Sequence, residues 1–207
     1  MRIRDAGVDG IGVVDDCCNF LRGRKMKNGL ILLLLLSCFF VITLTAQTKW
    51  GAIDKQESML QYKLIHTLHE IEAVSHEMES RVEINDAAKE IIKVTAQVEV
   101  ATFNSGNSNR DSHAMEVIDA ITYPEVNFSS TSIIRSGDSL KVNGSLTFHG
   151  ITKGITMAVF PVWSPHKLQV VGHFDVSLTA FNIERPSLLM IPVHDLLEFS
   201  INATYKY

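Results

Sequence analysis

Eight histidines are the residues of this 207-residue chain that are best suited to catalysis or metal binding. They are His66, His69, His76, His113, His149, His166, His173 and His194. They form no His-x-His pair and no His-Glu-x-x-His pattern, the spacings that bring two imidazoles to one metal ion. Such scattered histidines are more typical of surface or hydrogen-bonding positions than of a metal site. We therefore name no metal ligand.

Serine chemistry has equally little support in the sequence. No Gly-x-Ser-x-Gly segment is present, which would mark an exposed nucleophile on a sharp turn. Asp111, Ser112 and His113 are consecutive, but a catalytic triad is defined by the geometry of distant partners and not by adjacency. We predict that the protein is not an enzyme and name no catalytic residue.

The segment Ser145-Leu-Thr-Phe-His-Gly-Ile-Thr-Lys153 places a histidine and a lysine close together at the end of an alternating run. Alternation assigns Leu146 and Phe148 to the apolar face and His149 to the polar face. Gly150 then allows a tight turn into the next strand. The segment predicts a hairpin corner in which His149 anchors the turn by a hydrogen bond, and not a catalytic pair.

Most of the chain after residue 47 has the period-two alternation of strands with one buried face. The strongest runs cover residues 92–100, 140–148, 170–178 and 197–205, and weaker ones cover 59–64, 76–84, 126–133 and 155–162. These runs predict about eight strands, with hairpin turns at Ser136-Gly-Asp138 and Ser164-Pro-His166. One helix is expected over 111–121, capped by Asp111 and ended by Pro124.

Eight antiparallel strands can bury their apolar faces in a two-sheet sandwich or in a closed barrel. An eight-stranded barrel is just wide enough to be filled by side chains or to hold one small ligand. Small residues on the apolar face, which are Ala96, Gly144, Gly172 and Ala203, fit either outcome. They permit bending and close packing, or they leave an open lumen.

The first 46 residues are expected to lie outside the folded domain. Residues 29–44 are almost wholly apolar and follow Arg22, Arg24, Lys25 and Lys27, which is typical of a secretory signal peptide. We predict that residues 26–46 are this signal, that translation starts at Met26, and that residues 1–25 are a misassigned extension. An uncleaved anchor and a lipid-modified Cys38 are the alternatives. A signal peptide implies a periplasmic or secreted protein.

The expected domain, residues 47–207, contains no cysteine, because all three cysteines precede it. Its stability must therefore come from its core and sheet hydrogen bonds and not from disulfides. Removing the 6 basic and 4 acidic residues of the leader from the 19 and 23 of the whole chain leaves 13 against 19, a net charge of −6. This acidic balance argues against nucleic acid as a partner.

Five segments together resemble the YceI-like family of exported lipid-binding proteins. They are residues 107–113 (NSNRDSH), 123–133 (YPEVNFSSTSI), 142–157 (VNGSLTFHGITKGITM), 172–189 (GHFDVSLTAFNIERPSLL) and 194–201 (HDLLEFSI). The resemblance implies an all-β, lipocalin-like, eight-stranded antiparallel barrel with a short helix near its mouth. It also implies an elongated apolar cavity for a polyisoprenoid, such as a quinone tail, or for a fatty-acid-like amphiphile. The sequence departs from the family pattern at residues 66–78, Ala180 and Met190.

We therefore expect a periplasmic or secreted lipid-binding protein whose apolar strand faces enclose a lipid tail. The predicted apolar lining is Leu64, Val98, Val100, Phe103, Met115, Phe128, Leu146, Phe148, Phe174, Val176 and Phe181. Arg110, Asp111 and His113 are expected to organise the mouth, either by touching the ligand or by bracing the loop. Specificity would come from cavity length and from these few polar groups.

No cofactor is predicted, apart from a bound isoprenoid quinone or other lipid as the ligand itself. The membrane is expected to meet the protein only through the signal peptide or through lipid exchange, and the sequence leaves both a monomer and a homodimer open. Two other functions compete with lipid binding. One is a hydrolase or isomerase acting on such lipids in the same cavity, and the other is a filled barrel that binds a partner protein through its surface.

Overall fold

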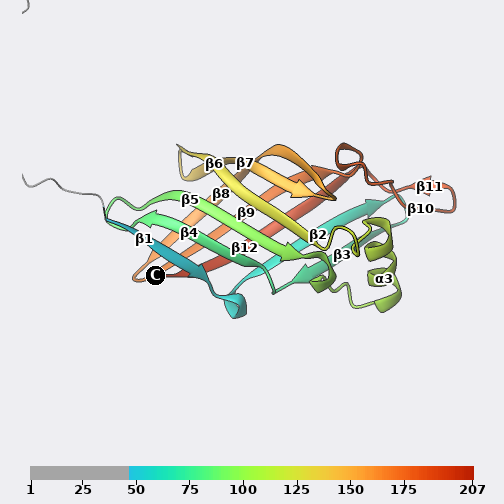
Figure 1. Cartoon of the computed structure of the whole chain (residues 1–207), viewed down its shortest axis with the longest axis horizontal. Helices are drawn as coiled ribbons and strands as arrows, with labels where there is room; N and C mark the ends of the chain where they lie inside the picture. The colour runs from blue at the N-terminus through green and yellow to red at the C-terminus, as the bar shows by residue number, and fades with distance from the viewer. Residues whose placement is uncertain (1–46) are drawn as a thin grey trace, which may run out of the picture. The chain divides into compact units, whose positions relative to one another are not determined.

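The computed structural model describes residues 47–207, which form a closed antiparallel β-barrel with one α-helix (Figure 1). The strands are β1 (Thr48–Ile53), β2 (Met59–His66), β3 (His69–Ser75), β4 (Glu79–Asn85), β5 (Glu90–Glu99), β6 (Glu125–Ser136), β7 (Ser139–Phe148), β8 (Ile151–Ser164), β9 (Lys167–Ser177), β10 (Ser187–Leu188), β11 (Ile191–Pro192) and β12 (Leu196–Lys206). The helix α3 spans Ser108–Val117, and three 3-10 turns are η1 (Lys55–Glu57), η2 (Val100–Thr102) and η3 (Thr179–Phe181). The predicted leader lies outside the described residues.

Strand order shows how the barrel closes. Neighbouring strands run β1-β4-β5-β6-β7-β8-β9-β12, and β12 pairs back onto β1. The other half of β12 pairs with β2, which in turn pairs with β3. The wall therefore contains two long strands that are each broken in the middle, one made of β1 and β2 and the other of β3 and β4. Together with β5, β6, β7, β8, β9 and β12, they give a wall of eight strands. This confirms the eight-stranded antiparallel barrel expected from the resemblance.

The wall is not continuous beside α3. Within residues 47–207, strand β3 has no ladder partner on the side away from β2, apart from an isolated bridge between Val74 and Asn104. Strand β5 leaves the sheet after Glu99 and continues through η2 into the loop before α3. The helix therefore lies where the sheet is interrupted, at one end of the barrel (Figure 1). We call this end, with α3 and the β10–β11 hairpin, the helix end.

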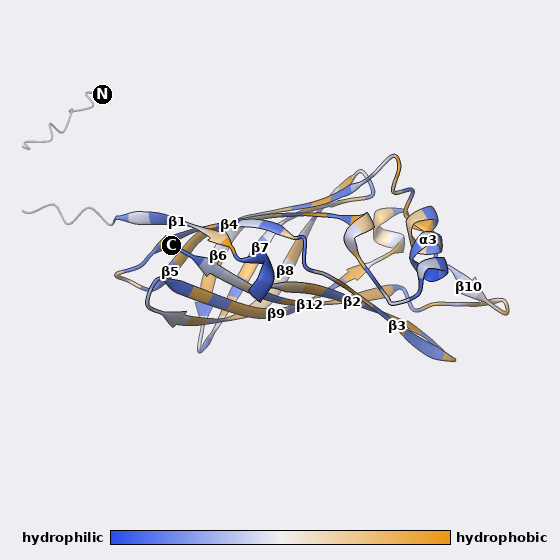
Figure 2. Ribbon diagram, turned by 90° about the horizontal axis from the view of Figure 1, so that it is seen from below, coloured by the Kyte–Doolittle hydropathy of each residue, from blue (hydrophilic) through white to orange (hydrophobic). Residues whose placement is uncertain are grey.

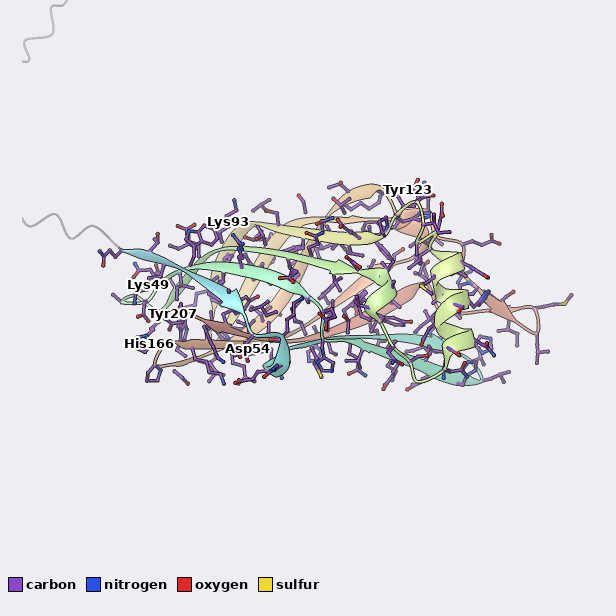
Figure 3. All side chains as sticks on the ribbon, turned by 60° about the horizontal axis from the view of Figure 1, so that its bottom comes forward. Lys49, Asp54, Lys93, Tyr123, His166 and Tyr207 are labelled. Atoms are coloured by element: carbon purple, nitrogen blue, oxygen red, sulfur yellow. The ribbon has the colours of Figure 1, made fainter. Side chains whose placement is uncertain are left out.

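The opposite end, which we call the turn end, carries tight polar turns. Gly137-Asp138 joins β6 to β7 and Pro165-His166 joins β8 to β9, as the sequence predicts. Lys49, His166 and Tyr207 lie together at this end, while Tyr123 lies beside the helix at the other (Figure 3). The C-terminal end of β12 and the β6–β7 and β8–β9 turns therefore lie at this end.

Every second residue of β7 is buried, and β9 keeps the same alternation except that Phe174 is half-buried. The hairpin corner after β7 has the predicted form, since His149 and Gly150 both adopt positive φ, of 48° and 70°. The His149 ring is anchored through Nδ1, which lies 3.0 Å from the carbonyl oxygen of Phe181. The corner thus fastens β7 to η3.

Three local expectations are wrong. The helix begins earlier than predicted, because its cap is Asn107, whose side chain accepts hydrogen bonds from the amides of Asn109 and Arg110. Strands β1 and β3 lie outside the predicted runs. Ile92 is exposed and Ile91 is buried, because the register between β4 and β5 shifts after Glu83 and leaves Ile92 as the extra residue of a bulge.

The small residues on the inner face do not share one role. A Cβ on Gly144 would lie 2.4 Å from the ring of Phe128, and one on Gly172 would lie 2.7 Å from Val159. Both glycines therefore permit close packing of a neighbouring side chain. Ala96, by contrast, borders open space inside the barrel. No helix among residues 47–207 is long and apolar enough to cross a bilayer.

Candidate functional site

The barrel encloses a cavity of about 660 Å³ that reaches the helix end. This volume lies within the range of about 300–1,000 Å³ that is typical of small-molecule sites. Its walls are the inward side chains of most barrel strands, together with residues of α3. The barrel is therefore filled at the turn end and hollow towards the helix end, so a wholly filled barrel does not describe this protein.

Aromatic side chains form the middle of the cavity wall. Phe174 of β9 and Phe199 of β12 stack with ring centroids 5.0 Å apart and an interplanar angle of 7°. Tyr62 of β2 lies with its ring centroid 6.3 Å from that of Phe199 and 5.2 Å from that of Phe103. These four rings present flat, rigid apolar surface, which suits contact with an unsaturated or branched hydrocarbon chain.

Arg110 is the one Arg or Lys that borders the cavity among residues 47–207. Its Nε is buried and has no hydrogen-bond partner within this part of the chain. A buried donor without a partner costs free energy, so a site of this kind favours a ligand that supplies an acceptor. Arg110 therefore leaves donor capacity available at the cavity rim.

Asp111, next along the helix, has a different task. Its Oδ1 accepts a hydrogen bond of 3.1 Å from the backbone amide of Ser105, which holds the loop before α3. Burial raises the pKa of the nearby Tyr62, the negative charge of Asp111 raises it further, and the charge of Arg110 opposes both. The Tyr62 hydroxyl thus keeps its proton at neutral pH and can donate to a ligand.

Three histidines, His66, His69 and His113, border the cavity at the helix end. His113 is largely exposed and its Nδ1 lies 3.7 Å from Glu116 of the same helix, so it belongs to the outer rim. His66 is buried and joins two loops: its Nδ1 accepts from the amide of Leu68, and its Nε2 lies 3.0 Å from the carbonyl of Ile191. The Nε2 tautomer fits both bonds, and it makes His66 a structural link.

Tyr205 borders the cavity, and its hydroxyl hydrogen-bonds to Ser80, which lies outside the lining. Ser80 Oγ donates to the carbonyl of Thr95 at 2.8 Å, and the Tyr205 hydroxyl lies 2.8 Å from the same Ser80 oxygen. With that donor committed, Tyr205 acts as the donor to Ser80. Burial raises the pKa of Tyr205. This hydrogen-bonded chain is neutral and has no free donor, while the Tyr205 oxygen can still accept a hydrogen bond.

Of the 14 predicted site residues, 13 border the cavity. They are Leu64, Val98, Val100, Phe103, Arg110, Asp111, His113, Met115, Phe128, Leu146, Phe148, Phe174 and Val176. Phe181 is the exception, because it lies outside the cavity lining. It is buried in η3 behind Phe148, with ring centroids 5.7 Å apart, and so supports the wall without bordering the cavity.

Several lining residues are missing from the predicted set. Tyr62 and Phe199 follow the same alternation as Leu64 and Leu197, so the pattern contains the signal for both. Ile71 lies on β3, which the sequence pattern does not reveal. No group of three or more metal-ligating side chains occurs in the region from 47 to 207. The arrangement is suited to holding an apolar chain with a polar end at the helix end.

Comparison with known proteins agrees with this geometry. The model of the YceI-like domain matches residues 52–205. The chain belongs to the YceI-like family. A UPF0312 protein of Pseudomonas savastanoi pv. phaseolicola is 26% identical over 162 residues, which cover 72% of this chain and 82% of that protein. Protein YceI of Escherichia coli O157:H7 is 26% identical over 100 residues, or 44% of this chain and 52% of that protein.

Solved structures share the fold. BcnA of Burkholderia cenocepacia superposes with a TM-score of 0.67 at 20% identity, covering 73% of this YceI-like chain and 98% of that chain. A polyisoprenoid binding domain from Saccharophagus degradans, implicated in plant cell wall breakdown, superposes with a TM-score of 0.56 at 11% identity, covering 75% and 97%. At these identities the likeness shows a common barrel architecture.

Proposed function

We propose that this YceI-like protein binds a long-chain amphiphile, either a polyisoprenoid such as a quinone or a fatty-acid-like lipid, in the barrel cavity. The observation that carries the proposal is the hollow of about 660 Å³, which is walled by aliphatic and aromatic side chains. Burial of each methylene contributes about 0.8 kcal/mol, so a long chain needs few polar contacts to bind tightly. The name of the Saccharophagus degradans domain supports an isoprenoid ligand.

The polar end of the ligand is proposed to lie against Arg110. The buried Nε of Arg110 lacks a partner within residues 47–207, while Asp111 is already engaged by Ser105. A carboxylate or a quinone carbonyl would give Arg110 an acceptor, and the Tyr62 hydroxyl would be a second donor beside it. Of the two roles open for the mouth residues, bracing suits Asp111 and ligand contact suits Arg110.

Binding without chemical change is the function that these contacts favour. His66 has both ring nitrogens committed to the backbone, and Asp111 holds a loop amide. Neither is placed as a general base beside a nucleophile. We further propose that the protein is exported to the periplasm or secreted, because of the basic and apolar leader before residue 47.

Native mass spectrometry of the mature protein, mixed with ubiquinone or palmitic acid in detergent, tests the proposal. The wild type is expected to retain one lipid per chain. Ala96→Trp places a large ring in the cavity and is expected to abolish uptake, because Ala96 borders the hollow. Ala158→Trp is the matched control, since Ala158 lies exposed on the outer face of β8. No uptake by the wild type, or equal uptake by a folded Ala96→Trp variant, would contradict lipid binding in the cavity.

The head-group contact is tested separately with Arg110→Met. This change removes the donors and keeps an unbranched side chain at the rim. Binding of palmitic acid is expected to weaken by about tenfold, which is about 1.4 kcal/mol, while binding of squalene, which has no head group, stays the same. An equal loss for both lipids would show that Arg110 only shapes the rim.

A further inference from the structure

The β10–β11 hairpin projects from the helix end as a short finger with an apolar tip. The views in Figures 1 and 2, turned by 90° from each other, both show the finger extending past α3. Leu188 pairs with Ile191, so the loop consists of the two residues Leu189 and Met190. Their exposed fractions are 76% and 97%, and Ile191 after them is 39% exposed.

The backbone at this tip is one that leucine and methionine adopt only at a cost. Leu189 and Met190 have φ of 53° and 67°, the pattern of a two-residue hairpin turn that favours Asn-Gly. The other non-glycine residues at positive φ in the described part of the chain are all polar: Lys89, Asp119, His149, His166 and Asn182. The tip therefore combines backbone strain with high exposure of two large apolar side chains, and neither favours the stability of the folded protein.

The finger adjoins the mouth of the cavity. Pro186 and Ser187 at its base border the cavity, and so does His66. The His66 ring connects the finger to the β2–β3 turn, because it bonds the carbonyl of Ile191 and the amide of Leu68. Leu68 is itself 59% exposed. An apolar collar of Leu68, Leu189, Met190 and Ile191 thus stands beside the opening.

We propose that this collar docks the protein on a lipid bilayer, with Leu189 and Met190 inserted among the acyl chains and the cavity mouth facing the membrane. The proposal adds a membrane contact to the proposed lipid binding, and its role in loading the cavity rests on that function. Apolar side chains on a protruding tip gain free energy by leaving water for the acyl region. Their contiguity with the mouth gives a lipid a path that avoids water.

A bilayer fits the finger better than a protein partner does. A stable protein interface takes about 20–30 residues on each side, whereas the collar consists of four side chains on two tips. The base carries both signs of charge, with Glu184 beside Arg185. We therefore expect insertion into neutral lipid that does not depend on salt, and not attraction to an anionic head group.

Flotation of the mature protein with phosphatidylcholine vesicles tests the docking surface. The wild type is expected to float with the vesicles at both low and high salt. The double variant Leu189→Asn/Met190→Gly is expected to lower the partition coefficient by at least about tenfold. It should unfold at the same or a higher temperature than the wild type, because Asn and Gly suit the turn. Phe160→Thr/Val162→Thr is the matched control, since it removes two exposed apolar residues from the outer face of β8 and should leave flotation unchanged.

A second measurement separates docking from lipid binding. Uptake of ubiquinone from detergent should be the same in the wild type and the Leu189→Asn/Met190→Gly variant, while uptake from vesicles should be slower in the variant. A protein that floats but takes up neither quinone nor palmitic acid from detergent would refute the proposed function and leave docking intact. Absence of flotation by the wild type, equal flotation by the variant, or a dimer in solution that the variant converts to a monomer would each overturn membrane docking.

Discussion

The turn end and the helix end of the barrel differ in what occupies their interior. At the turn end, Leu168 is fully buried and does not border the cavity, and the rings of Trp163 and Tyr207 meet with centroids 6.5 Å apart. At the helix end, β5 leaves the sheet, a helix replaces strand pairing and the interior is hollow. The difference shows that dense packing closes the turn end, while open space for a ligand extends from the helix end through most of the barrel.

The two ends differ in their surface polar contacts as well. Asp86 at the turn end pairs with Lys49 at 3.1 Å and with Lys89 at 2.6 Å, and it accepts a hydrogen bond of 3.1 Å from the Tyr207 hydroxyl. The two lysines also lie over aromatic rings, Lys49 over Tyr207 and Lys89 over Trp163. At the helix end, Arg110 Nε has no such partner among residues 47–207. The charged and hydroxyl groups around Asp86 at the turn end thus find their partners within the protein.

The largest change in the free energy of unfolding is expected when a leucine is truncated to alanine at one end or the other of the barrel. Leu168→Ala should lower the free energy of unfolding by about 2–5 kcal/mol, because it leaves a cavity in the packed end. Leu146→Ala should cost less, because Leu146 already borders empty space and has fewer contacts to lose. Urea unfolding of both variants measures the difference. Equal losses would show that the two ends are packed alike.

A smaller effect is expected where a glycine accommodates the ring of Phe128. Gly144→Ala should destabilise the protein by about 1–3 kcal/mol, because the new Cβ forces the ring to move towards the cavity. The displaced ring should also shorten the longest lipid that the cavity accepts. Gly154→Ala is the control, since a Cβ there meets no atom within 4 Å. Unfolding and native mass spectrometry of both variants give the two readouts, and a Gly144→Ala protein as stable as Gly154→Ala would refute the contact.

The smallest change in stability is expected from protonation of Asp86 at the turn end when the pH is lowered. Lys89, then Lys49 and Tyr207, lower the pKa of Asp86 from its ordinary value of 3.8 to about 2. A carboxyl group with a lowered pKa stabilises the fold above its unfolded pKa, and this stabilisation is lost as the pH falls through about 2. Urea unfolding between pH 5 and pH 2 should therefore show a steeper acid loss in the wild type than in Asp86→Asn. If the free energy of unfolding of the two proteins falls in parallel with pH, Asp86 does not contribute to the loss of stability in acid. The effect is small because the pair is solvent-accessible.

Sequence patterns predict the wall of the barrel better than its interior. Alternation identifies the strand with Leu146 and Phe148 and the turn at His149-Gly150, because a half-buried strand needs a period of two and a tight turn needs positive φ. It fails for β3, where the segment HEIEAVS carries charged residues on its outer face and lies at the interrupted part of the sheet. It also places Ile92 on the wrong face, because a bulge resets the period.

The cavity itself could not be predicted from alternation. The pattern tells which side chains point inward, but not whether they meet in the middle. Gly144 and Gly172 suggest free space in the sequence, and neighbouring side chains fill it in the fold. Phe181 is a large apolar residue like those that line the cavity, yet η3 holds it behind Phe148. Packing across the barrel depends on contacts between strands distant in sequence, which a local period does not encode.

The double pairing of β12 has a consequence for the order in which the protein is made. The seam that closes the wall joins Leu197 to Leu64 and Lys206 to Ala52, partners 133 and 154 residues apart in the chain. The segment that completes this seam, β12, follows every other barrel strand in the chain, and contacts of such long sequence separation form slowly. The lumen therefore comes into existence only after β12 has been synthesised. A ligand of this barrel is acquired by a chain that includes β12, and a chain that lacks this strand has no enclosed space to fill.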